Sequence, residues 1–160
     1  MTSAQEPSLE TLDALGSCDA LCLFLAEDDR PLSGAAGFVD WRMGGGLSRV
    51  LLQGFFVGAT DDQLLVPTAG KLAMPRLFAI GVGKEASLDG PRLGKVLEGA
   101  ATMLKRAGVA TVALALPKGD RLTDEVRVEA LKRHFLPSFG NGSVTVLAER
   151  GVRALLGGTR

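Results

Sequence analysis

Three apolar runs of strand length are the feature that most constrains the fold of this chain. They are Asp19–Ala26 (DALCLFLA), Arg76–Gly83 (RLFAIGVG) and Val109–Leu116 (VATVALAL). Each run is too short for a typical buried helix, and the third is rich in β-branched residues, which favours strands. Runs that stay apolar at nearly every position are typical of strands covered on both faces. We therefore expect Asp19–Ala26 and Val109–Leu116 to be buried strands.

The segments between these runs predict further strands and at least one long helix. Gln63–Thr68 and Ser143–Ala148 are short apolar segments bounded by turn residues, and we expect both to be strands. Between the second and third runs, apolar residues recur at the helical period, with Asp89 as N-cap and Gly108 as the stop. Strands that alternate with helices indicate an α/β fold with a mixed, largely parallel central sheet.

Four weaker patterns complete the expected elements. Ser8–Gly16 alternates weakly and predicts an opening edge strand. The spacing of apolar residues over Gly37–Gln53 suits an amphipathic helix, but Gly44-Gly45-Gly46 lies inside it. Because each Gly costs roughly 1 kcal/mol relative to Ala, either this helix breaks there or small residues are required. Thr123–Phe135 predicts another helix, and Glu149–Leu156 predicts a closing helical turn or two.

Length, charge and the chain's ends exclude several classes of protein. The chain has 160 residues, so a single domain over 1–160 is expected. Its 18 Lys and Arg balance 18 Asp and Glu, which argues against binding to nucleic acid or an acidic membrane surface. The first twelve residues carry Glu6 and Glu10 but no base, so no secretory signal is expected. No apolar window approaches membrane-spanning length.

The two cysteines point to a reducing compartment. Cys18 and Cys22 are too few for a disulfide framework, and we expect them to be buried thiols of a cytoplasmic protein. Their C-x3-C spacing is not a zinc signature, and the sequence has only one histidine, His134. His134 falls on the apolar face of its predicted helix, so we expect a packed or partly buried ring. The sequence predicts no metal site and no cofactor.

One glycine-rich segment invites a phosphate-binding interpretation. Gly81-Val82-Gly83-Lys84 follows a predicted strand, as a phosphate loop does. However, Phe78 stands where that loop needs its first Gly, and Glu85 stands where Ser or Thr should hold magnesium. A tight turn at the end of the strand is the better account. No nucleophile, base and oxyanion donor occur at a recognisable spacing, so no catalytic residue is predicted.

The two paired acids also fit a structural role. Asp28-Asp29 and Asp61-Asp62 both lie among turn residues, where Asp is common for backbone reasons. We expect their carboxylates to shape loops rather than to form a catalytic pair.

A series of motifs between Pro31 and Pro117 occurs in a specific order. The motifs are Leu32-Ser33 before a helix (Phe38–Gln53), the step Gly54–Gly58 (GFFVG), the strand Gln63–Thr68, the segment Arg76–Lys84 (RLFAIGVGK), and a helix and strand ending at Pro117. This order resembles the N-terminal domain of the leucine (cytosol) aminopeptidase family, the M17 metallopeptidases. The resemblance implies a three-layer α/β/α fold like that of macro domains.

The resemblance also implies that the catalytic half is missing. In this family the two metals and the catalytic Lys and Arg lie in a separate C-terminal domain, with motifs of the types V-G-K-G-x-x-F-D-[ST]-G-G and N-T-D-A-E-G-R. Neither motif occurs in this sequence, which stops at Arg160, about where that domain would start. No catalytic or metal residue of the family therefore maps onto this chain.

The family suggests what such a domain does. Its N-terminal domain packs on the catalytic domain, contributes to hexamer assembly, and in some bacterial members takes part in DNA binding. The zero net charge conflicts with DNA binding. We therefore expect a stand-alone, non-catalytic domain in protein–protein assembly or regulation. Its partner would be another protein, a second copy, or a separate aminopeptidase catalytic subunit.

The alternative is a small-molecule binder, because macro domains elsewhere bind ADP-ribose. The candidate residues for a nucleotide or ADP-ribose cleft are Gly44, Gly45, Gly46, Gly81 and Gly83. Macro domains use an early Asn-rich motif, whereas this sequence has a single Asn near its C-terminal end.

Overall fold

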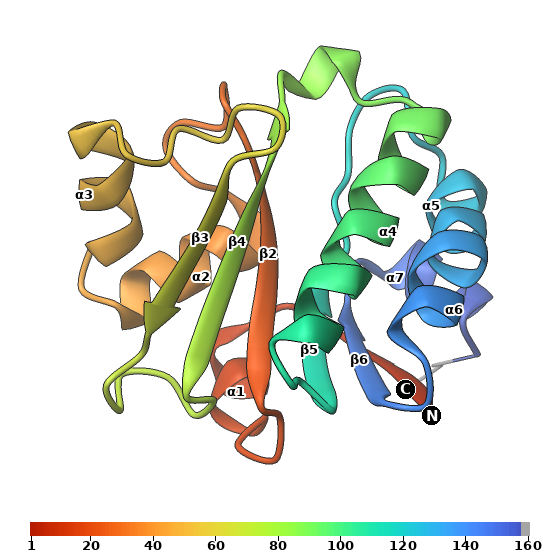
Figure 1. Cartoon of the computed structure of the whole chain (residues 1–160), viewed down its shortest axis with the longest axis horizontal. Helices are drawn as coiled ribbons and strands as arrows, with labels where there is room; N and C mark the ends of the chain where they lie inside the picture. The colour runs from red at the N-terminus through yellow and green to blue at the C-terminus, as the bar shows by residue number, and fades with distance from the viewer. Residues whose placement is uncertain (158–160) are drawn as a thin grey trace.

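The predicted buried strands form the middle of one sheet. The computed structural model describes residues 1–157, which form a six-stranded sheet in the order β1-β6-β5-β2-β4-β3 (Figure 1). The strands are β1 (Thr2–Gln5), β2 (Ala20–Ala26), β3 (Gln63–Pro67), β4 (Arg76–Gly83), β5 (Thr111–Ala115) and β6 (Ser143–Leu147). All neighbouring pairs are parallel except β3 with β4. The predicted mixed, largely parallel sheet is confirmed.

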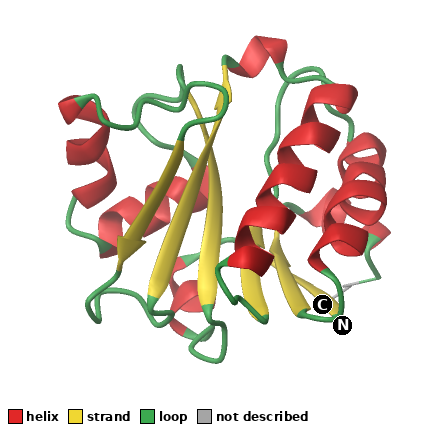
Figure 2. Ribbon diagram, viewed as in Figure 1, coloured by secondary structure: helices red, strands yellow, loops and turns green. Residues whose placement is uncertain are grey.

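Helices cover both faces of this sheet (Figure 2). They are α1 (Leu9–Asp13), α2 (Gly34–Arg42), α3 (Gly46–Gln53), η1 (Glu85–Ser87), α4 (Gly90–Arg106), α5 (Asp124–Ala130), η2 (Leu131–Phe135), α6 (Leu136–Phe139) and α7 (Arg150–Leu155). One core cluster lies between the sheet and α4 to α7, and the other lies between the sheet and α1 to α3. The three-layer α/β/α architecture is as predicted.

The central strand β2 shows why its sequence is continuously apolar. Ala20 and Cys22 point into the core under α4, whereas Leu21, Leu23 and Leu25 point into the core under α2. All five side chains are at most 1% exposed. Because burying one Leu is worth roughly 1.5–3 kcal/mol, a polar residue at any of these positions would cost most of that gain.

The opening of the chain differs from the prediction. The edge strand expected at Ser8–Gly16 is wrong, since this segment holds the short helix α1. Ser8 is its N-cap, and the Ser8 hydroxyl accepts a hydrogen bond from the backbone N–H of Thr11 at 3.0 Å. The edge strand is β1 instead, which pairs with β6 although its residues are mostly polar and exposed.

The glycine triplet breaks the helix expected over Gly37–Gln53. Gly44 and Gly45 have φ of 62° and 80°, which is the left-handed region that other residues rarely adopt. The chain therefore forms two helices, α2 and α3, joined by these glycines. Of the two alternatives that the sequence left open, the break is the one that occurs.

The remaining helices follow the predicted caps. The carboxylate of Asp89 accepts a hydrogen bond from the N–H of Arg92 at 3.0 Å and starts α4, which Gly108 follows with φ of 77°. The hydroxyl of Thr123 accepts one from the N–H of Val126 and starts α5. After α5 the chain continues through the wider helical turn η2 into α6, so the helical segment extends beyond its predicted end at Phe135. Among residues 1–157, no helix has both the length and the apolar character that crossing a bilayer requires.

Candidate functional site

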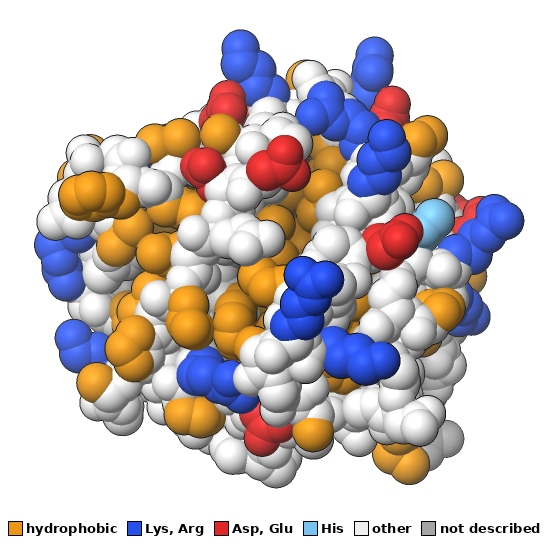
Figure 3. Space-filling view, in the orientation of Figure 1, with side chains coloured by type: hydrophobic (Ala, Val, Ile, Leu, Met, Phe, Trp, Pro, Cys, Tyr) orange, Lys and Arg blue, Asp and Glu red, His pale blue; other side chains and the backbone are white. Residues whose placement is uncertain are grey.

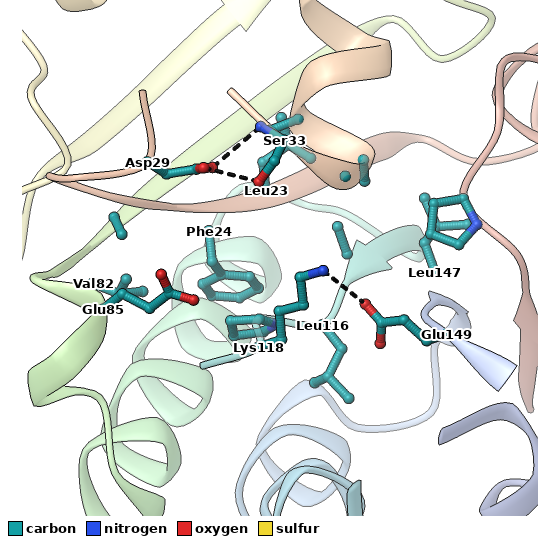
Figure 4. Close-up of a pocket in the computed structure, with 17 residues that line it drawn as sticks. Leu23, Phe24, Asp29, Ser33, Val82, Glu85, Leu116, Lys118, Leu147 and Glu149 are labelled. Atoms are coloured by element: carbon teal, nitrogen blue, oxygen red, sulfur yellow. Dashed lines mark hydrogen bonds and ion pairs between the residues drawn. The ribbon is translucent and has the colours of Figure 1, made fainter. Parts of the chain in front are cut away.

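A cleft opens where the parallel strands end. In open α/β sheets, ligands bind outside the carboxyl ends of the strands. Here β2, β4, β5 and β6 end around a cavity of about 120 Å³. Its apolar lining includes Phe24 of β2, Val82 of β4, Leu116 after β5 and Leu147 of β6 (Figure 4). This volume is small beside the roughly 300–1,000 Å³ of pockets that enclose drug-sized ligands.

The charged side chains of this cleft are mainly acidic. Asp29, Glu85, Glu149 and Lys118 are the charged residues among the described residues that line it. The Lys118 ammonium lies 3.9 Å from a carboxylate oxygen of Glu149 (Figure 4). A lining with three carboxylates and one ammonium favours a cationic or neutral ligand over a polyanion.

The N-terminus of α2 also borders the cleft, and a carboxylate already meets it. Asp29 accepts a hydrogen bond from the Ser33 hydroxyl at 2.8 Å and one from the Ser33 N–H at 3.4 Å. Ser33 is the N-cap residue of α2. Since the positive end of a helix attracts anions, the Asp29 carboxylate is favourably placed beside the N-cap of α2.

A buried arginine holds the other side of the cleft. The Arg127 side chain is 3% exposed. Its guanidinium donates to the carbonyl oxygens of Leu116 and Pro117 at 2.9 and 2.8 Å, and to Glu149 Oε2 at 2.8 Å. It also donates to Asp124 at 3.3 Å. Arg127 therefore fixes the segment after β5 and the Glu149 carboxylate in one arrangement.

The pKa of Glu149 reflects this arrangement. Burial alone raises the pKa of this carboxyl group. The hydrogen bond from Arg127 and the charges of Arg127 and Lys118 outweigh burial, so its pKa lies below the ordinary value. Glu149 is therefore ionised near neutral pH, and it is not a poised general acid.

Two of the predicted ligand residues pack the end of β4. A Cβ atom on Gly81 would lie 2.0 Å from the carbonyl oxygen of Ala59, and one on Gly83 would lie 2.7 Å from the Thr60 hydroxyl. Gly83 also has φ of 77°. These glycines let the segment before β3 approach the backbone of β4 closely. This is the tight strand-end turn that the spacing predicts, and neither glycine lines the cleft.

The other three predicted residues lie in the junction of α2 and α3. Gly44 accepts a hydrogen bond from the Arg49 guanidinium at 2.7 Å, and Gly45 is the N-cap residue of α3. Neither these two residues nor Gly46 line the cleft. The structure thus does not bring the five glycines together at the carboxyl ends of the strands, and their role in ligand binding stays a prediction.

Sequence reasoning missed the polar residues that do line the cleft. Lys118 comes two residues after the predicted strand 109–116, and Glu149 directly follows the predicted strand 143–148. The rule that ligand-binding residues follow the carboxyl ends of parallel strands is the signal that could have found them. Asp29 was interpreted as a turn residue, and its hydrogen bonds to Ser33 agree with that interpretation.

The histidine and the cysteines lie in structural surroundings. His134 packs on α4, where a Cβ on Gly94 would lie 2.8 Å from its Nε2, and its side chain is 41% exposed. Cys18 and Cys22 are buried free thiols, as predicted, and burial raises the pKa of both. In the described part of the chain, no group of three His, Cys, Asp or Glu side chains is placed to hold a metal ion.

Sheet order, helical layers and a cleft at the strand ends define an α/β domain of the macrodomain type. The macrodomain of DarG from Thermus aquaticus shares this fold, with a TM-score of 0.64 at 12% identity, over 93% of this chain and 99% of that one. The N-terminal domain profile of the cytosol aminopeptidase family matches residues 21–133. The chain therefore belongs to this family, through its N-terminal domain.

Individual proteins of the family agree with this assignment. A probable cytosol aminopeptidase from Pseudomonas syringae pv. syringae is 35% identical over 89 residues, which are 56% of this chain and 18% of that protein. A leucine aminopeptidase mutant from tomato aligns with 95% of this chain and 34% of its own, with a TM-score of 0.65 at 18% identity. This chain thus matches less than a fifth of the bacterial relative's length.

Proposed function

We propose that this domain catalyses no reaction itself and acts in protein–protein assembly or regulation. The observation that carries the proposal is the extent of the family match, which covers the N-terminal domain and only 18% of the bacterial relative. The cleft supports the same conclusion. It contains a salt-bridged carboxylate and buried apolar side chains. The one hydroxyl among its described lining residues, that of Ser33, is hydrogen-bonded to Asp29 in the turn that starts α2, and no histidine lines the cleft.

The test is peptidase activity of the purified 160-residue chain. We expect no hydrolysis of leucyl-amide substrates, with or without added zinc or manganese. Contaminating peptidases are distinguished with Glu149→Gln, which alters the cleft of this chain and leaves a contaminant unchanged. Hydrolysis by the wild type that this variant loses would refute the proposal.

A separate cytosol-aminopeptidase catalytic chain is the partner that the resemblance favours, and we place the domain with it in the cytosol. In the bacterial relative, the matched segment is joined to a much longer chain. The experiment mixes the purified domain with a catalytic chain from the same organism and follows sedimentation velocity. Co-sedimentation supports the proposal, whereas independent boundaries at micromolar concentrations contradict this choice of partner.

A second candidate function is the binding of a nucleotide or ADP-ribose in the cleft. The shared fold and the position of the cleft at the strand ends support it. The acidic lining, the Asp29 carboxylate at α2 and the volume of about 120 Å³ oppose it. Calorimetric titration with ADP-ribose decides the matter. A saturable heat that Lys118→Ala abolishes would establish binding, and the absence of heat together with an unchanged melting temperature would exclude it.

A further inference from the structure

The outer edge of β3 presents free backbone groups. β3 is the last strand of the sheet and pairs only with β4 on its inner side. At its start, the carbonyl of Asp62 accepts from the N–H of Gly81 at 2.8 Å. At its end, the N–H of Thr68 donates to the carbonyl of Pro75 at 3.0 Å. In an antiparallel ladder hydrogen-bonded positions alternate, so the even-numbered residues face β4 and positions 63, 65 and 67 face outward.

This edge has only one of the usual protections against pairing with another strand, the proline at its end. Natural edges are protected by charged side chains, prolines, bulges or very short strands. The sequence of β3 is QLLVP, without a charge, and the Leu65 side chain is 54% exposed. By contrast, β1 at the opposite edge has the sequence TSAQ. On the face of the molecule drawn in Figure 3, hydrophobic side chains gather over the half that contains β3 and β4.

We propose that β3 pairs antiparallel with β3 of a second copy of this chain, about a two-fold axis at Leu65. This inference rests on the proposed assembly function and adds a second copy of the chain as a further partner. The two Leu65 residues would exchange two hydrogen bonds. Each Gln63 N–H would donate to the carbonyl of Pro67 in the other copy, which adds two more. The missing N–H of Pro67 therefore removes only the outermost bond at each end.

The pairing is complementary in charge and shape. Asp61 and Asp62 lie before β3, and Lys71 lies after it. Antiparallel pairing about Leu65 therefore brings the acidic turn of each copy to the same end of the ladder as the basic turn of its partner. The exposed Leu65 side chains lie side by side on one face, as an apolar cross-strand pair. An isologous contact of this kind closes at two copies and does not propagate into fibres.

The expected dimer is weak. Five residues a side form a small contact compared with the roughly 800 Å² per partner of a standard interface. Further apolar surface is available from Leu52 and Phe55, which are 86% and 88% exposed. They lie at the end of α3, the helix at the same edge of the molecule as β3 (Figure 1). We therefore expect a dissociation constant of about 1–100 μM.

The experiment combines sedimentation equilibrium with disulfide trapping. In a hydrogen-bonded antiparallel pair the Cα atoms are about 5.5 Å apart, within the range that a disulfide spans. We therefore expect Leu65→Cys to form a covalent dimer under mild oxidation. The control is Leu155→Cys, at a position that is 43% exposed on α7. The native Cys18 and Cys22 are buried.

A second variant tests the noncovalent dimer. Leu65→Lys places two like charges at the axis and should weaken dimerisation at least tenfold, whereas Leu155→Lys should leave it unchanged. A wild type that stays monomeric at 200 μM, or a Leu65→Cys variant that crosslinks no faster than Leu155→Cys, would overturn the inference. A dimer that Leu65→Lys leaves intact would also overturn it, since another surface would then form the contact. Binding of the catalytic chain by a monomeric domain would leave the proposed function standing.

Discussion

Replacing Arg127 with methionine tests whether this one side chain holds the cleft together. Its guanidinium is 3% exposed and donates to two carbonyl oxygens of the segment after β5. It also binds Glu149, which lines the cleft from the segment after β6. Methionine fills a similar length of space but donates nothing. The variant therefore removes the hydrogen bonds while it keeps most of the packing.

The expected cost follows from what is left unpaired. Each buried carbonyl without a partner costs about 1–3 kcal/mol. The Glu149 side chain is 47% exposed, so water solvates its unpaired charge and this loss adds little. Burial of the methionine offsets about 1 kcal/mol. We expect Arg127→Met to lower the free energy of unfolding by about 3 kcal/mol, a large part of the roughly 5–15 kcal/mol of a typical domain.

Urea denaturation followed by circular dichroism measures this loss. The matched control is Arg133→Met, because Arg133 is 71% exposed and pairs with Glu129 one helical turn away. Such an exposed pair is worth only about 0.3–0.5 kcal/mol. A loss below 1 kcal/mol for Arg127→Met, or equal losses in the two variants, would refute the reasoning. Water or a rearranged loop would then satisfy the carbonyls that Arg127 now serves.

Three further variants test the glycine packing and the acid response. Gly81→Ala should destabilise the domain by more than about 2 kcal/mol, since its Cβ would lie 2.0 Å from the Ala59 carbonyl oxygen. Gly99→Ala in α4 meets no atom within 4 Å and should stabilise by up to about 1 kcal/mol; thermal melts that rank the two alike would contradict this. Because the pKa of Glu149 is lowered in the folded state, its contribution is present above its unfolded pKa and is lost as the pH falls through the folded one. Glu149→Gln should therefore flatten the decline of stability as the pH falls below the ordinary glutamate pKa of 4.5, and parallel curves for variant and wild type would be the contrary result.

The parts of the fold that the sequence predicts are those with strong local signals. β2 and β4 are buried on both faces, so nearly every residue in them is apolar, and their bounds follow from that run. The helix α4 has an Asp cap and a Gly stop at its two ends. β1 carries no such signal. Its four residues are mostly polar and exposed, and it is a strand only because β6 lies beside it.

The cleft was harder to predict because its residues are distant in the sequence and are brought together only by the order of the strands in the sheet. Lys118 and Glu149 are 31 positions apart in the sequence, yet their side chains approach to 3.9 Å. They meet because β5 and β6 are adjacent and parallel, so that both strands end at the same edge of the sheet. The role of Arg127 was equally difficult to predict from the sequence. Its place among apolar residues of α5 becomes informative only once the segment after β5 lies beside it.

The glycines and the cleft residues lead to one conclusion about what this domain binds. At Gly81 and Gly83 the missing side chains make room for the segment before β3, namely the Ala59 carbonyl oxygen at Gly81 and the Thr60 hydroxyl at Gly83. At the cleft, Asp29 meets the N-terminus of α2, and Glu149 is paired with both Arg127 and Lys118. The Asp29 and Glu149 carboxylates and the Lys118 ammonium are thus each paired within the chain. Unpaired backbone groups also lie at the outer edge of β3, and N–H and C=O groups at a sheet edge are matched best by another strand. The physical chemistry therefore favours a protein partner over a small anion.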